Sequence, residues 1–179
     1  MKSLLLSLVL FAFLSLPARA ELRIGTQAPD FTAEASLGGN QFTFALKDAL
    51  QHGPVVLYFY PAAFTEGCTV EAHEFAEATE DFAAAGATVI GVSTDDIATL
   101  KRFSVSECRS KFAVAADADR HIVKAYDAAL FGLLPYANRT SYVVAPDSTV
   151  LYAYTDMDPE PHIANTLAAV RKWRAEHQQ

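Results

Sequence analysis

Two strand-like runs separated by a helical pattern constrain the fold of this chain more than any other feature. Residues 55–60 form a continuous apolar, β-rich run that Pro61 ends, and residues 87–94 form a second run of the same kind. Such runs are typical of central strands covered on both faces. Between them, apolar or small residues recur with the spacing of one helix face, at Ala72, Phe75, Ala76, Thr79, Phe82 and Ala83. The order strand, helix, strand predicts an α/β domain.

The remaining patterns complete one domain around this unit. Residues 31–35 and 41–44 flank Gly38-Gly39-Asn40 and predict a hairpin. We expect short helices at 45–51 and 120–126 and strands at 112–116, 140–144 and 149–154. A further helix should follow Asp95 or Asp96, with one face formed by Ile97, Leu100, Ser104 and Cys108. The last helix should begin at Asp158-Pro159, with an inner face formed by Ile163, Leu167, Val170 and Trp173. The predicted fold is therefore a central mixed β-sheet with helices on both faces and an N-terminal β-hairpin.

The first twenty residues are typical of a secretory signal peptide. A short basic start, Met1-Lys2, precedes an apolar run over residues 4–16, and Ala18-Arg19-Ala20 has the small-x-small spacing of a cleavage site. The apolar run is too short to span a bilayer. We therefore expect residues 1–20 to be a signal peptide and residues 21–179 to be the exported domain, with no membrane attachment after cleavage. The bacterial periplasm is the expected compartment.

The charge balance argues against a nucleic-acid partner. The 179 residues carry 21 acidic side chains against 14 Lys plus Arg, a formal net charge of −7. Without Lys2 and Arg19 the exported domain would have a net charge of −9. An acidic surface repels a phosphate backbone.

The two cysteines, Cys68 and Cys108, support two different interpretations. In an exported protein an even number of cysteines is typical of a structural disulfide. Cys68, however, lies where a helix is expected to begin, after a buried strand and a short loop. Free backbone N–H groups and the helix dipole favour a thiolate there, and the thiolate is the reactive form. Both a structural and a reactive role remain open on these grounds.

Other kinds of site have little support. There is no C-x-x-C pair and no cysteine–histidine spacing of a zinc site. His52, His121, His162 and His177 are scattered and form no metal set, and no Gly-rich phosphate loop is present. We therefore predict neither a metal nor an organic cofactor.

Four motifs stand out in the sequence: Pro61-x-x-x-Thr65-x-x-Cys68, Thr69-x-Glu71, the strand 139–147 that opens with Arg139, and Gly25-x-x-Ala28-Pro29-Asp30-Phe31. Together they resemble peroxiredoxins, and Thr69-x-Glu71 resembles the Q-type branch of that family, named after bacterioferritin comigratory protein. The resemblance covers about residues 23–175 and implies a thioredoxin-like fold.

The resemblance also implies a role for each motif residue. Cys68 would be the peroxidatic nucleophile, and Arg139 would donate hydrogen bonds to its thiolate and to the peroxide. The hydroxyl of Thr65 would hold the peroxide in line, and Pro61 would shield the thiolate from water. Glu71 would orient Arg139.

Two further family features concern the backbone and the second cysteine. The N–H groups of Gly67 and Cys68 would help to bind peroxide. Many Q-type members carry a resolving cysteine where this chain has His73, and some carry it in the next helix, where Cys108 lies. Cys108 is thus the candidate resolving residue, which would form an intramolecular disulfide with Cys68 after local unfolding. The alternative is a one-cysteine enzyme in which Cys108 only packs in the core.

The function implied by the resemblance is a thiol-dependent peroxidase. It would reduce hydrogen peroxide or small alkyl hydroperoxides and be re-reduced by a thioredoxin-like thiol protein. We expect a monomer, since no interface stripe is visible in the sequence. The alternative from another class is an exported thioredoxin-fold binding or assembly module with a permanent Cys68–Cys108 disulfide.

Overall fold

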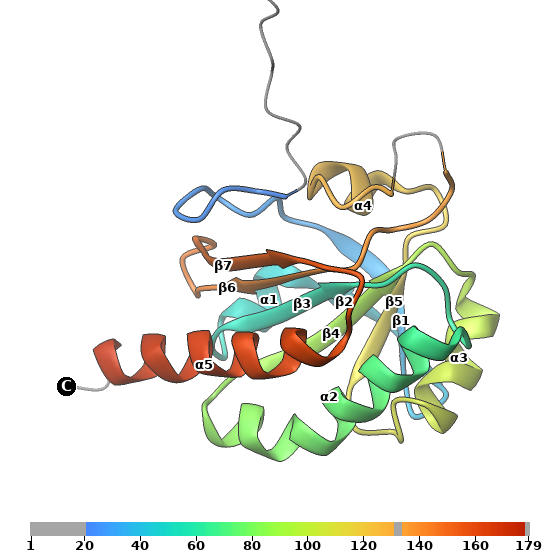
Figure 1. Ribbon diagram of the computed structural model, residues 1–179, viewed down its shortest axis with the longest axis horizontal. Coiled ribbons are helices and arrows are strands. Elements are labelled where there is room, and N and C mark those ends of the chain that lie inside the picture. Colours follow the sequence, from blue (N-terminus) through green and yellow to red (C-terminus); the bar gives the residue numbers. More distant parts are fainter. Residues whose placement is uncertain (1–20, 131–133, 178–179) are drawn as a thin grey trace, which may run out of the picture.

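A single mixed sheet organises the chain (Figure 1). The computed structural model describes residues 21–130 and 134–177. Its strands are β1 (Thr32–Leu37), β2 (Asn40–Ala45), β3 (Val55–Phe59), β4 (Thr88–Ser93), β5 (Ala113–Ala116), β6 (Thr140–Val144) and β7 (Val150–Thr155). They lie in the order β2-β1-β5-β4-β3-β6-β7. The pairs β3–β4 and β4–β5 are parallel and the other four pairs are antiparallel. The predicted α/β class, mixed sheet and N-terminal hairpin are confirmed.

The helices divide between the two faces of the sheet. They are α1 (Leu46–Leu50), α2 (Glu66–Ala84), α3 (Ile97–Ser106), α4 (His121–Ala125) and α5 (Glu160–His177). One buried cluster joins α1 and α4 to alternate residues of β3, and the other joins α2, α3 and α5 to the residues between them. Figure 1 shows α2 and α5 along one side of the sheet and α4 on the other. Every residue of β3 is buried, as its continuous apolar run predicts.

A close contact between β3 and β4 shapes the core under α2. Tyr58 pairs with Gly91 across the parallel strands, and the Tyr58 ring stacks on Phe75 of α2 with centroids 4.4 Å apart. A Cβ atom on Gly91 would lie 2.7 Å from Cζ of Tyr58. Gly91 therefore leaves the space that the tyrosine ring fills, and that ring in turn positions α2.

Two sequence predictions for α2 and α3 need correction. Helix α2 begins at Glu66, which agrees with the predicted helix start at Cys68, but Ala83 of its predicted apolar face is exposed. Helix α3 ends at Ser106, so Cys108 lies beyond the helix rather than on its inner face. The reason is local backbone geometry, because Arg109 and Ser110 adopt left-handed conformations that a helix cannot continue through.

The inner face of α5 also differs from the prediction. Leu167 and Val170 are buried as expected, but Ile163 and Trp173 are only half-buried. The polar residues His162 and Thr166 are buried instead. The helix is rotated from the predicted orientation because its first turn covers polar partners rather than an apolar core.

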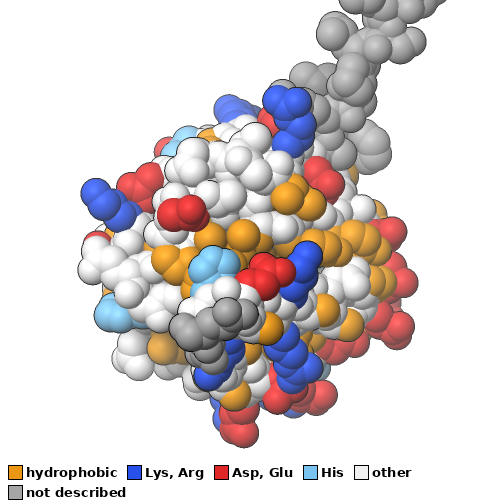
Figure 2. Space-filling view, turned by 90° about the vertical axis from the view of Figure 1, so that its left-hand side faces the viewer, with side chains coloured by type: hydrophobic (Ala, Val, Ile, Leu, Met, Phe, Trp, Pro, Cys, Tyr) orange, Lys and Arg blue, Asp and Glu red, His pale blue; other side chains and the backbone are white. Residues whose placement is uncertain are grey.

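Figure 2 shows the face that the C-terminal end of α5 reaches, where hydrophobic side chains form a band. A groove of about 540 Å³ between α5 and the edge strand β7 is lined partly by Ile24, Leu151, Tyr152 and Trp173. Among the described helices, none is both long enough and apolar enough to cross a membrane. The predicted signal peptide lies outside the described residues.

Candidate active site

Cys68 lies in the first turn of α2, directly after β3 and a short loop. It is the third residue of the helix and is 1% exposed. The N–H groups in the first turn of a helix have no acceptor within the helix and point toward its N-terminal end. The sequence prediction that Cys68 sits at a helix start is confirmed, and the site combines burial with free donors.

The loop before Cys68 is anchored by a carboxylate at the end of β4. The Ala63 N–H donates to Oδ2 of Asp95 over 2.8 Å, and the Ser93 hydroxyl donates to the same oxygen over 2.8 Å. Asp96, not Asp95, caps α3 by accepting from the Thr99 N–H. Sequence reasoning considered Asp95 only as a helix cap. Its role in holding the loop depends on β3 and β4 being parallel neighbours.

Thr65 and Pro61 form the outer part of this loop. Thr65 is the N-cap residue of α2, and its hydroxyl is exposed and donates to the Ala62 carbonyl over 2.9 Å. That hydrogen bond uses the hydroxyl proton and leaves the oxygen lone pairs as acceptors. Pro61 is half-buried and has no N–H to donate.

Arg139 brings a second segment to Cys68. It precedes β6, whose first residue, Thr140, pairs with Phe59 at the end of β3. The Arg139 side chain is 3% exposed, and its Nη2 lies 3.6 Å from Sγ of Cys68. Its Nη1 is paired with Oε2 of Glu71, and its Nε donates to the Met157 carbonyl over 3.1 Å. Contacts with Glu71 and with the Met157 carbonyl therefore orient the guanidinium against the sulfur.

Gly67 provides the space for that guanidinium. A Cβ atom at position 67 would lie 3.0 Å from Nη2 of Arg139. The residue before Cys68 is thus a glycine for a steric reason, which is independent of any contact that its N–H makes with a ligand.

Glu71 is a fully buried carboxyl with one oxygen paired and one facing a histidine. Burial raises its pKa to about 8, although Arg139 acts in the opposite direction. Within the described part of the chain, its Oε1 has no hydrogen-bond partner and lies 4.0 Å from Nδ1 of His162. The sequence prediction pairs Glu71 with Arg139, and the structure shows that contact.

His162 was missed by sequence reasoning, which treated it as one of several scattered histidines. It is fully buried at the start of α5. Its Nε2 lies 3.0 Å from the Asp156 carbonyl, which can only accept, so Nε2 carries the proton. Its Nδ1 then accepts from the Ser141 hydroxyl at 2.8 Å. Burial lowers the pKa of His162 to about 4, and Arg139 adds to that shift. No periodicity in the sequence marks this residue.

Cys108 is the other cysteine of the same core. It is fully buried, in the apolar cluster that also contains Cys68, and both cysteines are free thiols. Burial raises the pKa of the Cys108 thiol, and Glu107 raises it further. Burial therefore favours the neutral form of this thiol. His73 lies outside this core and pairs with Glu107.

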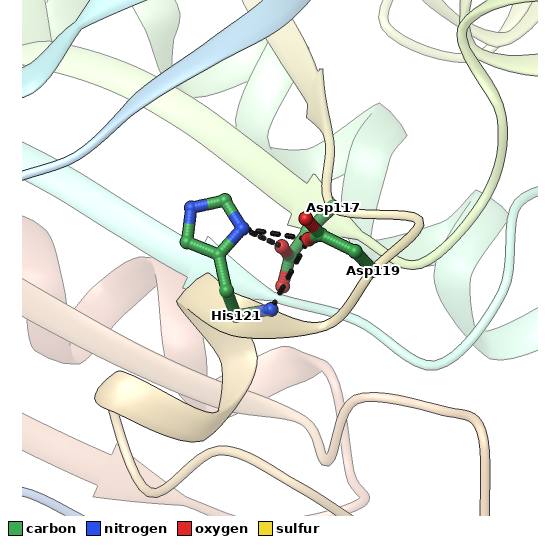
Figure 3. A group of neighbouring side chains, drawn as sticks. All are labelled: Asp117, Asp119 and His121. Atoms are coloured by element: carbon green, nitrogen blue, oxygen red, sulfur yellow. Dashed lines mark hydrogen bonds and ion pairs between the residues drawn. The ribbon is translucent and has the colours of Figure 1, made fainter.

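One group outside this region brings a histidine together with two carboxylates (Figure 3). His121 Nδ1 lies 2.6 Å from Asp119 Oδ1 and 3.3 Å from Asp117 Oδ1. The sequence predicts no metal set, yet these three residues have metal-compatible spacing. The Asp117 carboxylate already accepts the N–H groups of Ile122 and Val123. The hydrogen bond to Asp119 raises the pKa of His121. We interpret this group as the polar cap of α4.

The fold and the Cys68 site together define a family. Residues 24–153 match the AhpC/TSA family, and the chain belongs to that family. Its fold is the thioredoxin-like peroxiredoxin fold, as the sequence predicts. The similarities with individual proteins then indicate the peroxiredoxin Q branch.

Three comparisons carry that assignment. The chain is 38% identical over 146 residues to chloroplastic peroxiredoxin Q of Oryza sativa subsp. japonica, which is 80% of this chain and 64% of that protein. It is 38% identical over 151 residues to chloroplastic peroxiredoxin Q of Arabidopsis thaliana, and the alignment covers 83% of this chain and 67% of that protein. The crystal structure of peroxidoxin BcpB from Mycobacterium tuberculosis superposes with a TM-score of 0.77 at 30% identity, covering 84% and 97%. The chain thus spans less than two thirds of the rice protein.

Proposed function

We propose that this protein is a thiol peroxidase in which Cys68 reduces peroxides. The observation that carries the proposal is the guanidinium of Arg139, 3.6 Å from the Cys68 sulfur and held there by Glu71. A fixed cation beside a buried sulfur stabilises negative charge that develops on the peroxide oxygens. Membership of the peroxiredoxin family supports this assignment.

The first step is a displacement at oxygen. The Cys68 thiolate attacks the distal oxygen of ROOH, the S–O bond forms as the O–O bond breaks, and the released RO⁻ takes a proton to give ROH. Arg139 and the N–H groups of Gly67 and Cys68 would bind the peroxide oxygens, and Thr65 would accept a hydrogen bond from the peroxide O–H. Pro61 would limit access of water. The substrates would be hydrogen peroxide and small alkyl hydroperoxides.

The second step would use Cys108. Its thiol attacks the sulfenic acid of Cys68, the S–S bond forms, and the hydroxyl group leaves as water. A thioredoxin-like dithiol protein would then reduce the disulfide, and no metal or organic cofactor takes part. The alternative, a binding or assembly module with a permanent Cys68–Cys108 disulfide, is less well supported. Both cysteines are free thiols, and the Cys68 sulfur contacts the guanidinium of Arg139. Export to the periplasm and a monomeric state stay predictions.

Two serine variants test the proposal. Purified protein with a small dithiol reductant should consume hydrogen peroxide, and Cys68→Ser should abolish that consumption. Cys108→Ser should still form the sulfenic acid on Cys68, which a sulfenate-specific alkylating reagent and mass spectrometry detect. Normal turnover by Cys68→Ser would refute the role of Cys68. A Cys68–Cys108 disulfide in peroxide-treated wild type would support the resolving role, and over-oxidised Cys68 with free Cys108 would refute it.

A further inference from the structure

The segment that carries Cys108 is fastened to α2 by three side-chain pairs, of which two are ion pairs and one is a hydrogen bond between a histidine and a carboxylate. This segment, residues 107–111, joins the end of α3 to β5 (Figure 1). The pairs are His73 Nε2 to Glu107 Oε2 at 3.0 Å, Arg109 Nη1 to Glu77 Oε1 at 3.0 Å, and Lys111 Nζ to Glu80 Oε1 at 3.5 Å. Helix α2 also carries Cys68, so these pairs join the two cysteine-bearing segments.

The spacing of the partners shows that the segment runs along α2. The partners on the helix are at positions 73, 77 and 80, which lie on one helix face. The partners on the segment are alternate residues, 107, 109 and 111. Cys108 lies between the first two attachment points and its side chain is fully buried. The pairs therefore lie on the surface, on both sides of the position from which the Cys108 side chain points into the core.

The attached conformation of the segment is strained. Arg109 and Ser110 have φ values of +49° and +57°, in the left-handed region that side chains with a Cβ disfavour. Two consecutive residues of this kind must be held in place by surrounding contacts. Loss of the ion pairs removes one set of those contacts, and the strain then favours departure of the segment.

We propose that the three side-chain pairs form a clasp that sets how fast Cys108 leaves the core to react with Cys68. The proposal rests on the resolving role of Cys108 in the proposed function. Release of the clasp frees the thiol to attack the Cys68 sulfenic acid, with formation of the S–S bond and loss of water. A tighter clasp prolongs the sulfenic acid and exposes it to a second peroxide, which would oxidise it to the sulfinic acid.

A double variant with side chains of nearly the same shape tests the clasp. Glu77→Gln with Glu80→Gln removes both ion pairs of the clasp and leaves both cysteines, Arg139 and the His73–Glu107 pair in place. Asp81→Asn is the matched control, because Asp81 lies on the same helix and forms a similarly exposed ion pair with Arg171 of α5, at 3.1 Å. Reduced protein is mixed with one equivalent of hydrogen peroxide, quenched in acid at intervals and alkylated, and mass spectrometry then follows the disulfide over time.

We expect the double variant to form the disulfide about fivefold faster than wild type, since each exposed pair contributes only modestly to stability. Oxidation of Cys68 itself, followed by competition with a second peroxidase, should be unchanged. Asp81→Asn should match wild type. Added salt should speed wild type more than the double variant, because it screens pairs that the variant lacks.

The outcomes separate the clasp from the proposed function. If wild type and double variant form the disulfide at equal rates, the clasp is refuted and the resolving role stands. If Asp81→Asn is accelerated as much as the double variant, the effect is general loosening of α2 and the clasp is also refuted. If neither protein forms the disulfide, the resolving role and the clasp fall together. A disulfide that forms only in the double variant supports the clasp.

Discussion

Arg139 Nη2 lies 3.6 Å from Cys68 Sγ, while the other terminal nitrogen of the same guanidinium is paired with Glu71. The Nε donates to the Met157 carbonyl, so the planar group cannot turn without losing a contact. One buried cation thus joins the sulfur to a buried carboxyl. The position of the guanidinium beside Cys68 therefore depends on Glu71 and Met157, which hold its other nitrogens.

Arg139→Lys should slow oxidation of Cys68 about 100-fold, a loss comparable to removal of a donor that stabilises a developing oxyanion. An ammonium group keeps the charge but cannot make three contacts in fixed directions. The rate constant is measured by competition with a second peroxidase. Arg171→Lys, an exposed arginine paired with Asp81, is the control and should behave as wild type. A lysine variant as fast as wild type would show that charge alone suffices.

Gly67→Ala should lower the same rate constant about tenfold, because misplacement of a positioned group by a fraction of an ångström is costly. The added Cβ would lie 3.0 Å from Nη2 of Arg139 and would push the guanidinium away from the sulfur. Val70→Ala, an exposed position on the following turn, is the control. The thermal midpoint of unfolding should be the same for both variants. An unchanged rate in Gly67→Ala would mean that Arg139 shifts without consequence.

His162→Gln should remove part of the acid sensitivity of the fold. The folded-state pKa of His162 is about 4, below its ordinary value of 6.5, so the unfolded chain binds more protons between these pH values. Its contribution to stability is therefore lost as pH falls through that range. Wild type should lose about 3 kcal/mol more of its free energy of unfolding than the variant between pH 7 and pH 4. Urea unfolding at several pH values measures both.

Glu71 acts in the opposite direction in the same experiment. Its folded-state pKa of about 8 exceeds its ordinary value of 4.5, so the folded protein binds more protons between them. Its contribution to stability falls as pH rises. The two residues therefore offset each other between pH 4.5 and pH 6.5, and the difference between variant and wild type is the quantity to compare. Parallel curves for the two proteins would contradict a neutral buried His162.

Gly91→Ala should lower the free energy of unfolding by about 2 kcal/mol, as expected for overpacking of a close-packed core. The new Cβ would lie 2.7 Å from Cζ of Tyr58, whose ring is already stacked on Phe75. Adding Tyr58→Leu should make the alanine at position 91 less destabilising than it is alone, which a double-mutant cycle detects. Strictly additive effects would argue against a direct clash.

The local elements could be predicted where short-range chemistry decides them. Residues 140–144 form β6 with the predicted limits, and Gly38-Gly39 turns the predicted hairpin between β1 and β2. The end of α3 could not be predicted, because left-handed Arg109 and Ser110 are held by contacts with other segments. The burial of His162 likewise depends on Ser141 and Asp156, which belong to β6 and the segment after β7.

The sequence by itself determined that the chain forms an α/β domain and that Cys68 lies in the first turn of a helix that follows a buried strand. Those features depend on hydrophobic periodicity and on the order of residues along one stretch of chain. The motif resemblance implies that Arg139 faces Cys68, but only the tertiary structure decided how the guanidinium is held, that Gly67 leaves room for it, and that His162 is buried beside Glu71. Those contacts join distant segments, such as Cys68 and Arg139, which are 71 residues apart, and their geometry is set by strand pairing and packing rather than by local sequence.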